Sequence, residues 1–199
     1  FGGYAEYKCL RDNDLVELKP SNMTFAEAAT VPIGGLTALQ FLRQAGVKAG
    51  HNVLIYGASG SVGTFAVQIA KYFGAEVTGV CSTQNKELVR SLGADRIVDY
   101  TAEDFRNLPQ KFDAIFDAVG KISRSQCDKI LKPGATFVTV KGSPKRGPKD
   151  LYTLKNIIEA GKLRTVIDKT YDLESIRDAH AYVEKFRKRG NVSVKIADE

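Results

Sequence analysis

Residues 53–63 constrain the fold of this chain more than any other part of the sequence. Residues 53–56 form a short apolar run with the length and composition of a strand buried on both faces. The run breaks at small residues, and from Val62 onward apolar side chains recur every three or four positions, as on one face of a helix. The sequence therefore predicts a strand, a tight glycine turn and a helix in direct succession.

The glycine turn reads Ala58-x-Gly60-x-x-Gly63 and is preceded by Gly57. Glycines at these positions remove side chains where a ligand approaches the backbone and where the helix lies close to the strand. The first N–H groups of the helix, together with its dipole, favour an anion in the turn, and a pyrophosphate fits this description. A tight strand-to-helix turn in any α/β protein would share the pattern, so both interpretations stay open on this motif alone.

Strand and helix patterns continue to alternate after the turn. Strands are predicted at 76–81, 96–99, 112–117 and 135–140, and helices at 85–91 and 122–131. Such alternation predicts parallel strands joined by right-handed crossovers, which is an α/β fold with a doubly wound parallel (Rossmann) sheet. Ligands of these sheets bind beyond the carboxyl ends of the strands, where the strand order reverses.

The two ends of the chain have weaker patterns. Two short strands are predicted at 4–9 and 15–18, a short helix capped by Thr24 and ended by residues 31–35, and a second helix at 36–44. Residues 142–148 are rich in Gly, Pro and Lys, which is typical of a linker. After it we expect a helix at 151–160, a strand near 165–167, a helix at 173–188 and a strand at 191–196. The chain opens on Phe1 in the middle of a strand-like pattern, so we expect a piece of a longer protein.

Composition narrows the class of protein. A hydrophobic content of 43% with 26% charged residues is typical of a globular domain, and no continuous apolar run approaches the about 20 residues needed to cross a bilayer. The three cysteines are widely spaced, without a C-x-x-C, which suits a reducing cytoplasm rather than a disulfide framework. The net charge of +6 indicates either a solvated surface or attraction to phosphate-bearing ligands, and nucleic acid is not expected because no aromatic residues interleave with the bases.

The residues after the second predicted strand bear on cofactor choice. NAD-binding folds place an acidic residue there, about 20 residues past the glycines, to bind the ribose hydroxyls. Here the chain has no Asp or Glu; Ser82, Thr83 and Lys86 offer hydroxyls and an ammonium group instead. These groups suit a 2′-phosphate and favour NADPH over NADH, although an ordinary polar loop would look similar.

Several short motifs occur in one order along nearly the whole chain. They are Gly35-Leu36-Thr37-Ala38-Leu39, the glycine turn, Leu92-Gly93-Ala94-Asp95, Val98-Asp99-Tyr100, Glu159-Ala160-Gly161-Lys162-Leu163, Ala179-His180 and Arg189-Gly190-Asn191-Val192. Together they resemble the medium-chain dehydrogenase/reductase superfamily, in its zinc-independent quinone oxidoreductase branch. The resemblance implies an NADP-binding Rossmann domain at residues 31–143, with remnants of a β-rich GroES-like catalytic domain at both ends. The first remnant is residues 1–30. The second is residues 144–199, a linker and a segment that returns to the catalytic domain.

The resemblance also implies a set of cofactor-binding residues and no metal site. Thr37 is expected near the nicotinamide or its ribose; Ser59, Gly60, Ser61 and Val62 at the pyrophosphate; Ser82, Thr83 and Lys86 at the 2′-phosphate; Tyr100 near the adenosine phosphate; and Val119, Val140 and Gly142 along the cofactor. Core packing is an equal alternative for Val119 and Val140. No cysteine stands just before Thr37, where zinc-containing members carry one, and no catalytic residue is assigned.

The activity implied is hydride transfer from NADPH to a quinone, enone or 2-alkenal, with a homodimer and a cytoplasmic location as further expectations. An NADPH-binding module without robust catalysis, such as a sensor or scaffold, is the alternative, as is an inactive truncated fragment. Family members usually carry a longer helical segment where this chain has only the short join at 143–150.

Overall fold

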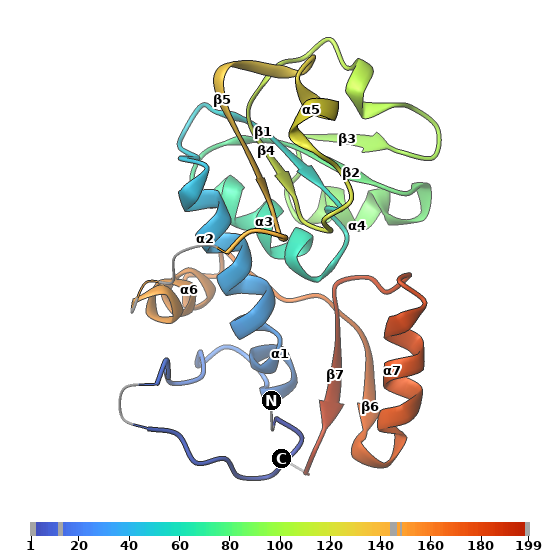
Figure 1. The fold of residues 1–199 in the computed structure, drawn as a ribbon. Coiled ribbons are helices and arrows are strands. Elements are labelled where there is room, and N and C mark those ends of the chain that lie inside the picture. Colours follow the sequence, from blue (N-terminus) through green and yellow to red (C-terminus); the bar gives the residue numbers. More distant parts are fainter. Residues whose placement is uncertain (1–2, 12–13, 144–146, 148, 198–199) are drawn as a thin grey trace.

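The computed structural model describes residues 3–11, 14–143, 147 and 149–197, and its larger part, at the top of Figure 1, is built around a five-stranded parallel sheet. The strands are β1 (Asn52–Tyr56), β2 (Glu76–Cys81), β3 (Arg96–Asp99), β4 (Phe112–Asp117) and β5 (Leu131–Thr139). Their order is β3-β2-β1-β4-β5, so the chain turns back at β1, which pairs with β2 on one side and with β4 on the other. The predicted doubly wound sheet is confirmed.

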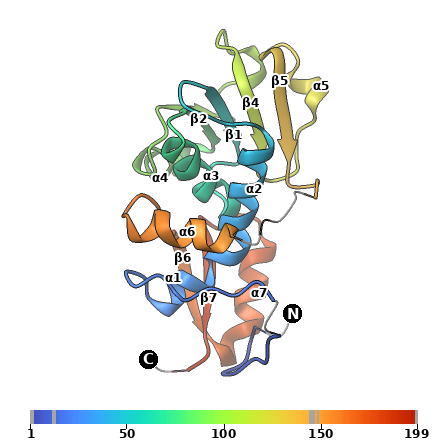
Figure 2. The ribbon, with the colours of Figure 1, turned by 90° about the vertical axis from the view of Figure 1, so that its left-hand side faces the viewer.

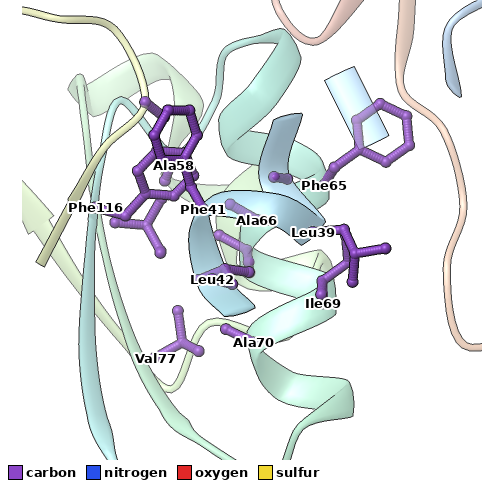
Figure 3. Packing of buried hydrophobic residues seen from close by; sticks show 14 of the residues in the cluster. Leu39, Phe41, Leu42, Ala58, Phe65, Ala66, Ile69, Ala70, Val77 and Phe116 are labelled. Carbon is purple, nitrogen blue, oxygen red and sulfur yellow. The ribbon is translucent and has the colours of Figure 1, made fainter. Parts of the chain in front are cut away.

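Both faces of the sheet are covered. Helices α2 (Leu36–Gln44), α3 (Ser61–Tyr72) and α4 (Lys86–Ser91) pack on one face, and the 3₁₀ turn η3 (Phe105–Asn107) and α5 (Arg124–Cys127) lie on the other. Successive residues of β1 alternate between these two cores: Ile55 belongs to the first and Leu54 to the second. Figure 3 shows the larger core, where side chains of α2 and α3 meet Val77 of β2 and Phe116 of β4.

Helices α1 (Phe25–Ala29), η1 (Val31–Gly35) and α2 form one continuous run. The predicted capping box is present, because the Thr24 hydroxyl accepts from the Glu27 N–H while the Glu27 carboxylate accepts from the Thr24 N–H. The prediction that residues 31–35 end the helix is wrong: they form a π-helical turn with Pro32 in its first turn, where a missing N–H is tolerated. A Cβ on Gly34 would lie 2.8 Å from the Phe65 ring, so the glycine lets α3 pack against this turn.

Counted as one segment, the helical run Phe25–Gln44 is long and apolar enough to cross a bilayer by length and composition alone. We expected no such segment from the sequence because the helices on either side of Pro32 were predicted to be separate. Within the molecule, 56% of its most apolar window is buried, and α2 packs against α3 and α6. A buried core helix of a globular protein has the same properties, so this run is weak evidence for a membrane.

The C-terminal part forms a separate small unit below the main sheet (Figures 1 and 2). It consists of β6 (Ile167–Asp172), the 3₁₀ turn η4 (Leu173–Ser175), α7 (Ile176–Glu184) and β7 (Asn191–Lys195), and β6 pairs parallel to β7. The predicted helix at 173–188 is too long, since α7 ends at Glu184 and Phe186 adopts a positive φ of 54°. A left-handed residue cannot continue a right-handed helix.

The N-terminal strands predicted at 4–9 and 15–18 are wrong. Described residues 3–11 and 14–20 are assigned to neither strand nor helix and are mostly exposed. A strand needs a neighbour for its N–H and C=O groups, and no ladder pairs with these residues in the described part of the chain. The segment is instead held by single contacts, such as the Ser21 N–H donating to the Glu159 carboxylate on α6 (Asp150–Glu159) at 3.0 Å.

The region before β5 also differs from the prediction. A helix was expected at 122–131, but α5 covers only four residues and β5 already begins at Leu131. The Phe112 N–H donates to the Ile130 carbonyl at 2.8 Å, which brings Leu131 into the ladder opposite Phe112. Pairing with β4 therefore overrides the local helical pattern.

The short join before α6 ends at Asp150, whose side chain is buried. Its carboxylate accepts from the Gln40 amide at 3.0 Å, from the Gly147 N–H at 2.7 Å and from Arg43, with which it forms an ion pair. These contacts fix the start of α6 against α2. The part of the predicted linker at 144–146 and 148 lies outside the described residues.

Candidate functional site

The glycine turn lies at the carboxyl end of β1, where the strand order reverses. Gly57 has a φ of 81°, and the N–H groups of Gly57 and Ala58 donate to the Val80 carbonyl at 3.1 and 3.0 Å. Helix α3 then begins at Ser61 with Gly60 at its N-cap and no side chain capping it. The first N–H groups of α3 are thus left for a ligand, and the helix dipole favours an anion there.

Two of the three glycines in the turn are required by close contacts. A Cβ on Gly63 would lie 2.1 Å from the Gly57 carbonyl oxygen, and a Cβ on Gly57 would lie 2.6 Å from Val119. A Cβ on Gly60 would meet only the Gly57 oxygen at 3.4 Å and Val119 at 4.0 Å. Gly63 therefore serves helix-to-strand packing, whereas Gly60 leaves open space in front of the helix.

A cavity of about 200 Å³ opens at this turn, which we call the glycine-turn cavity. Its described lining consists of Tyr56, Gly57, Ser59, Gly60, Cys81, Ser82, Gln84, Asn85, Tyr100, Val119, Lys121, Phe186, Arg187 and Lys188. A second cavity of about 490 Å³ shares Tyr56, Tyr100 and Lys121 with it. Through these shared residues the two cavities adjoin each other at the carboxyl ends of β1, β3 and β4.

The structure brings five of the expected cofactor residues together in this cavity: Ser59, Gly60, Ser82, Tyr100 and Val119. Thr83 and Lys86 lie beside it, and the Ser61 hydroxyl donates to the Asn191 side chain instead of standing free. Val62 and Val140 pack against the larger core, and Gly142 lies near the Phe41 ring. Thr37 is half-buried on α2. The cavity lining includes none of Thr37, Val62, Val140 and Gly142.

A buried carboxylate stands next to the residues expected at the 2′-phosphate. Asp99, at the end of β3, accepts from the Thr83 and Thr101 hydroxyls at 2.6 Å each, and Lys86 lies 3.7 Å away. The hydrogen bonds from Thr101 and Thr83 lower the pKa of Asp99 to about 2, so it is ionised at neutral pH. Counting along β2 could not find this group, because the parallel neighbour β3 supplies it.

Asn85 is a cavity residue that the sequence patterns did not indicate. It is 6% exposed, and its amide nitrogen donates to the hydroxyls of Ser59 at 3.0 Å and Ser82 at 3.2 Å. It therefore joins the glycine turn to the 3₁₀ turn η2 (Thr83–Asn85) after β2. Its amide oxygen is buried without a partner, which is an unusual state for a polar atom and indicates a site that a ligand or water completes.

Asp117 fixes the loop that carries Val119. The carboxylate is fully buried at the end of β4 and accepts from the N–H groups of Val119, Gly120 and Ile122 at 2.9 to 3.2 Å. The Thr139 hydroxyl of β5 donates to it as well. Val119 thereby stands against Gly57 at the wall of the cavity, while its own side chain stays 40% exposed.

The C-terminal segment forms another wall of the cavity. The Gly190 N–H donates to the Ser59 carbonyl at 2.8 Å, and Gly190 forms an isolated parallel bridge with Gly60. Phe186, Arg187 and Lys188 precede this contact and line the cavity. In the sequence, Arg187 and Lys188 stand out only as basic residues, because the position of this segment depends on a contact between residues more than a hundred positions apart.

Metal-ligating groups do not gather in the described part of the chain: no cluster of three His, Cys, Asp or Glu side chains is found there. The absence of a metal site stays a prediction. The cysteines that are buried, Cys81 and Cys127, have their pKa raised to about 11 by burial, so they are protonated thiols at neutral pH.

Comparison with known proteins agrees with this geometry. A family model described as zinc-binding dehydrogenase matches residues 61–181. The chain is 37% identical to 2-methylene-furan-3-one reductase of Solanum lycopersicum and 35% identical to the chloroplastic NADPH-dependent alkenal/one oxidoreductase of Arabidopsis thaliana, each over 98% of this chain and 53% of the relative. The structure of the quinone oxidoreductase from Coxiella burnetii matches with a TM-score of 0.77 and 29% identity, over 90% of this chain and 63% of that one.

The chain spans about half the length of the curated relatives it matches. The similarity in sequence nonetheless extends over 98% of this chain, and the similarity in structure extends over 90% of it. The chain therefore belongs to the zinc-binding dehydrogenase family, within the quinone oxidoreductase-like branch of the medium-chain dehydrogenase/reductase superfamily.

Proposed function

We propose that the protein is an NADPH-dependent oxidoreductase that transfers hydride to a quinone, an enone or a 2-alkenal. The observation that carries the proposal is the uncapped N-terminus of α3, which opens on the glycine-turn cavity at the point where the strand order reverses. The names of the relatives in tomato and Arabidopsis, a furanone reductase and an NADPH-dependent alkenal/one oxidoreductase, support the substrate class.

The residues present fit a dinucleotide. The N–H groups at Ser61 would face its pyrophosphate, and the hydroxyl of Ser82 and the ring of Tyr100 would face the adenosine end. The buried amide oxygen of Asn85, which has no protein partner, is consistent with a polar ligand in this cavity. When bound, the cofactor supplies the hydride; the protein binds it, excludes water and orients it toward the acceptor.

We also propose cofactor contacts for the expected residues outside the cavity lining, which are Thr37, Thr83, Lys86, Val140 and Gly142. The division of the chain after residues 30 and 143, the formation of a homodimer and a cytoplasmic location are proposals as well. Free cysteines support a reducing compartment. Neither a membrane nor a nucleic acid is proposed as a partner.

The test is a titration of the protein with NADPH and with NADH, followed by measurement of NADPH oxidation with a quinone and with a 2-alkenal. We expect tighter binding of NADPH than of NADH, and turnover with at least one acceptor. Tight binding without turnover of either acceptor would instead support a binding module, the second candidate. Absence of binding by either cofactor would overturn the assignment of the cavity.

A further inference from the structure

Two of the three groups expected at a 2′-phosphate are already in contact with a carboxylate. The Thr83 hydroxyl donates to Asp99 at 2.6 Å, and the Lys86 ammonium group lies 3.7 Å from the same carboxylate oxygen. The third group, the hydroxyl of Ser82, accepts from the Asn85 amide at 3.2 Å. A phosphate that used the first two groups would therefore have to compete with Asp99 for them.

The Asp99 carboxylate is held in place by its other oxygen atom. This oxygen accepts from the Thr101 hydroxyl at 2.6 Å and from the Thr101 N–H at 3.0 Å, and Asp99 as a whole is only 4% exposed. The hydrogen bonds from Thr101 and Thr83 also keep the pKa of Asp99 at about 2. The carboxylate is thus a fixed negative charge at neutral pH.

This charge lies directly behind the wall of the glycine-turn cavity. Asp99 stands opposite Cys81 in the parallel pairing of β2 and β3, and both Cys81 and Ser82 line the cavity. Burial and, after it, the charge of Asp99 raise the pKa of the Cys81 thiol to about 11, so the field of the carboxylate reaches the wall. The described lining itself contains no Asp or Glu. A phosphate bound at this wall would therefore come close to a second anion.

The contact between Asp99 and Lys86 does little to orient the lysine for a ligand. At 3.7 Å the two charged atoms are farther apart than in a hydrogen bond, and the Lys86 side chain is 40% exposed. Exposed pairs of this kind contribute little, whereas two anions a few ångströms apart near a protein surface repel each other more strongly. Removal of the carboxylate should therefore help a 2′-phosphate more than it disturbs Lys86.

We infer that Asp99 is a specificity-determining residue at the adenosine end of the cavity, where it opposes the 2′-phosphate of NADPH and keeps NADH a competitive cofactor. Its charge repels the phosphate, and its contacts with Thr83 and Lys86 engage two groups that would otherwise bind it. NADH has an uncharged hydroxyl at this position and is not repelled. Asp99 acts through its charge and its neighbours from outside the described lining, so it is a positioning residue.

The inference rests on the proposed function for the identity of the cofactor, and nucleotide fragments test it separately. We would measure the affinities of adenosine 2′,5′-bisphosphate and of adenosine 5′-monophosphate for the protein, for Asp99→Asn and for Glu87→Gln. Glu87→Gln is the matched control, because it removes one negative charge beside Lys86 in the sequence, while the Glu87 side chain is 85% exposed and pairs with Arg90. NADPH and NADH are then compared in the same variants.

We expect Asp99→Asn to raise the affinity for the bisphosphate about tenfold or more relative to the monophosphate, and Glu87→Gln to leave this ratio unchanged. Lys86→Gln, added to Asp99→Asn, should cancel the gain, because the gain depends on the released ammonium group. If Asp99→Asn does not fold, Asp99→Ser tests the same ratio, since it also removes the charge.

A ratio that stays the same or falls in Asp99→Asn would overturn the inference, as would an equal rise in Glu87→Gln. A purely structural role of Asp99 would weaken both fragments by the same factor and leave the ratio unchanged. If the ratio rises but NADPH is never oxidised, the inference stands and the proposed function fails. An unchanged ratio in a protein that oxidises NADPH would remove the inference alone.

Discussion

The α-carbon of Gly63 faces the carbonyl oxygen of Gly57 so closely that an added Cβ would lie 2.1 Å from that oxygen. The obstacle is backbone, which cannot rotate away as a flexible side chain would. Helix α3 and strand β1 are therefore held together at the one point where the proposed pyrophosphate site forms. The same contact explains why a glycine is needed here even if no ligand is bound.

Gly63→Ala is expected to destabilise the fold by about 3 kcal/mol, near the upper end of the range for overpacking a core. Gly60→Ala is the matched control, because Gly60 has an ordinary φ of −81° and an open space in front of it. We expect Gly60→Ala to fold normally and to bind NADPH more weakly, since its methyl group enters the cavity. Urea unfolding and cofactor titration of both variants check this, and similar stability of the two would contradict it.

Asp99 is expected to make the stability depend on pH in the acid range. Hydrogen bonds lower its pKa from 3.8 to about 2 in the folded protein, so the unfolded chain takes up this proton first as the pH falls. The stabilisation is complete above about pH 4 and is lost as the pH falls through about 2. Asp99→Asn should remove this component of the acid unfolding curve, whereas Glu174→Gln, at an exposed position, should leave it in place.

How far the sequence predicted the fold depends on how local each signal was. Strands β2, β3 and β4 and helix α2 match the predicted bounds to the residue, because each is a short apolar or periodic run between clear turn signals. The N-terminal strands failed because a strand exists only with a partner, which a pattern within one segment cannot supply. The helix at 122–131 failed because pairing of Leu131 with Phe112 outweighed local propensity.

The site was predicted only where its residues belong to one local motif. Ser59, Gly60 and Ser82 follow directly from the turn and the end of the second strand, and all three line the cavity. Asp99 reaches the site from a neighbouring strand, and Lys188 reaches it through the contact of Gly190 with the glycine turn. Neither position can be read from spacing along one element.

Phe186 is expected to carry backbone strain, because it is the one non-glycine residue with a left-handed φ in the described part of the chain. This conformation costs about 1–2 kcal/mol for a residue with a Cβ. Phe186→Gly should therefore raise the stability by up to about 1 kcal/mol after the extra flexibility of glycine in the unfolded chain is counted. The ring is 85% exposed, so little packing is lost.

Phe186→Ala is the control for this effect, since it removes the ring but keeps the strain. Calorimetry should show a higher melting temperature for Phe186→Gly than for Phe186→Ala. If the ring covers a bound cofactor, both variants should lose NADPH affinity by a similar factor, because Phe186 lines the cavity. A lower stability of the glycine variant would show that the conformation is not strained.

The cysteines should react at very different rates with an aromatic disulfide reagent at neutral pH. Cys9 is exposed, whereas Cys81 and Cys127 are buried thiols whose pKa values are raised to about 11. Because the thiolate is the reactive form, one fast and two slow phases are expected. Cys9→Ser should abolish the fast phase, and bound NADPH should slow the labelling of Cys81, which lines the cavity. Fast labelling of all three would mean that the buried thiols are accessible.

Ser82→Asp is expected to reverse the preference between NADPH and NADH. Ser82 lines the cavity directly after β2, and its neighbour Thr83 donates to Asp99, which already places one negative charge at this end of the strand. A second carboxylate would repel a 2′-phosphate and accept hydrogen bonds from ribose hydroxyls, so NADPH should weaken about tenfold or more while NADH improves. Ser82→Asn, which has the same size without the charge, should change NADPH affinity far less. Titration of both variants with both cofactors decides the matter, and equal affinity of the unaltered protein for NADPH and NADH would remove the basis for a 2′-phosphate site at Ser82.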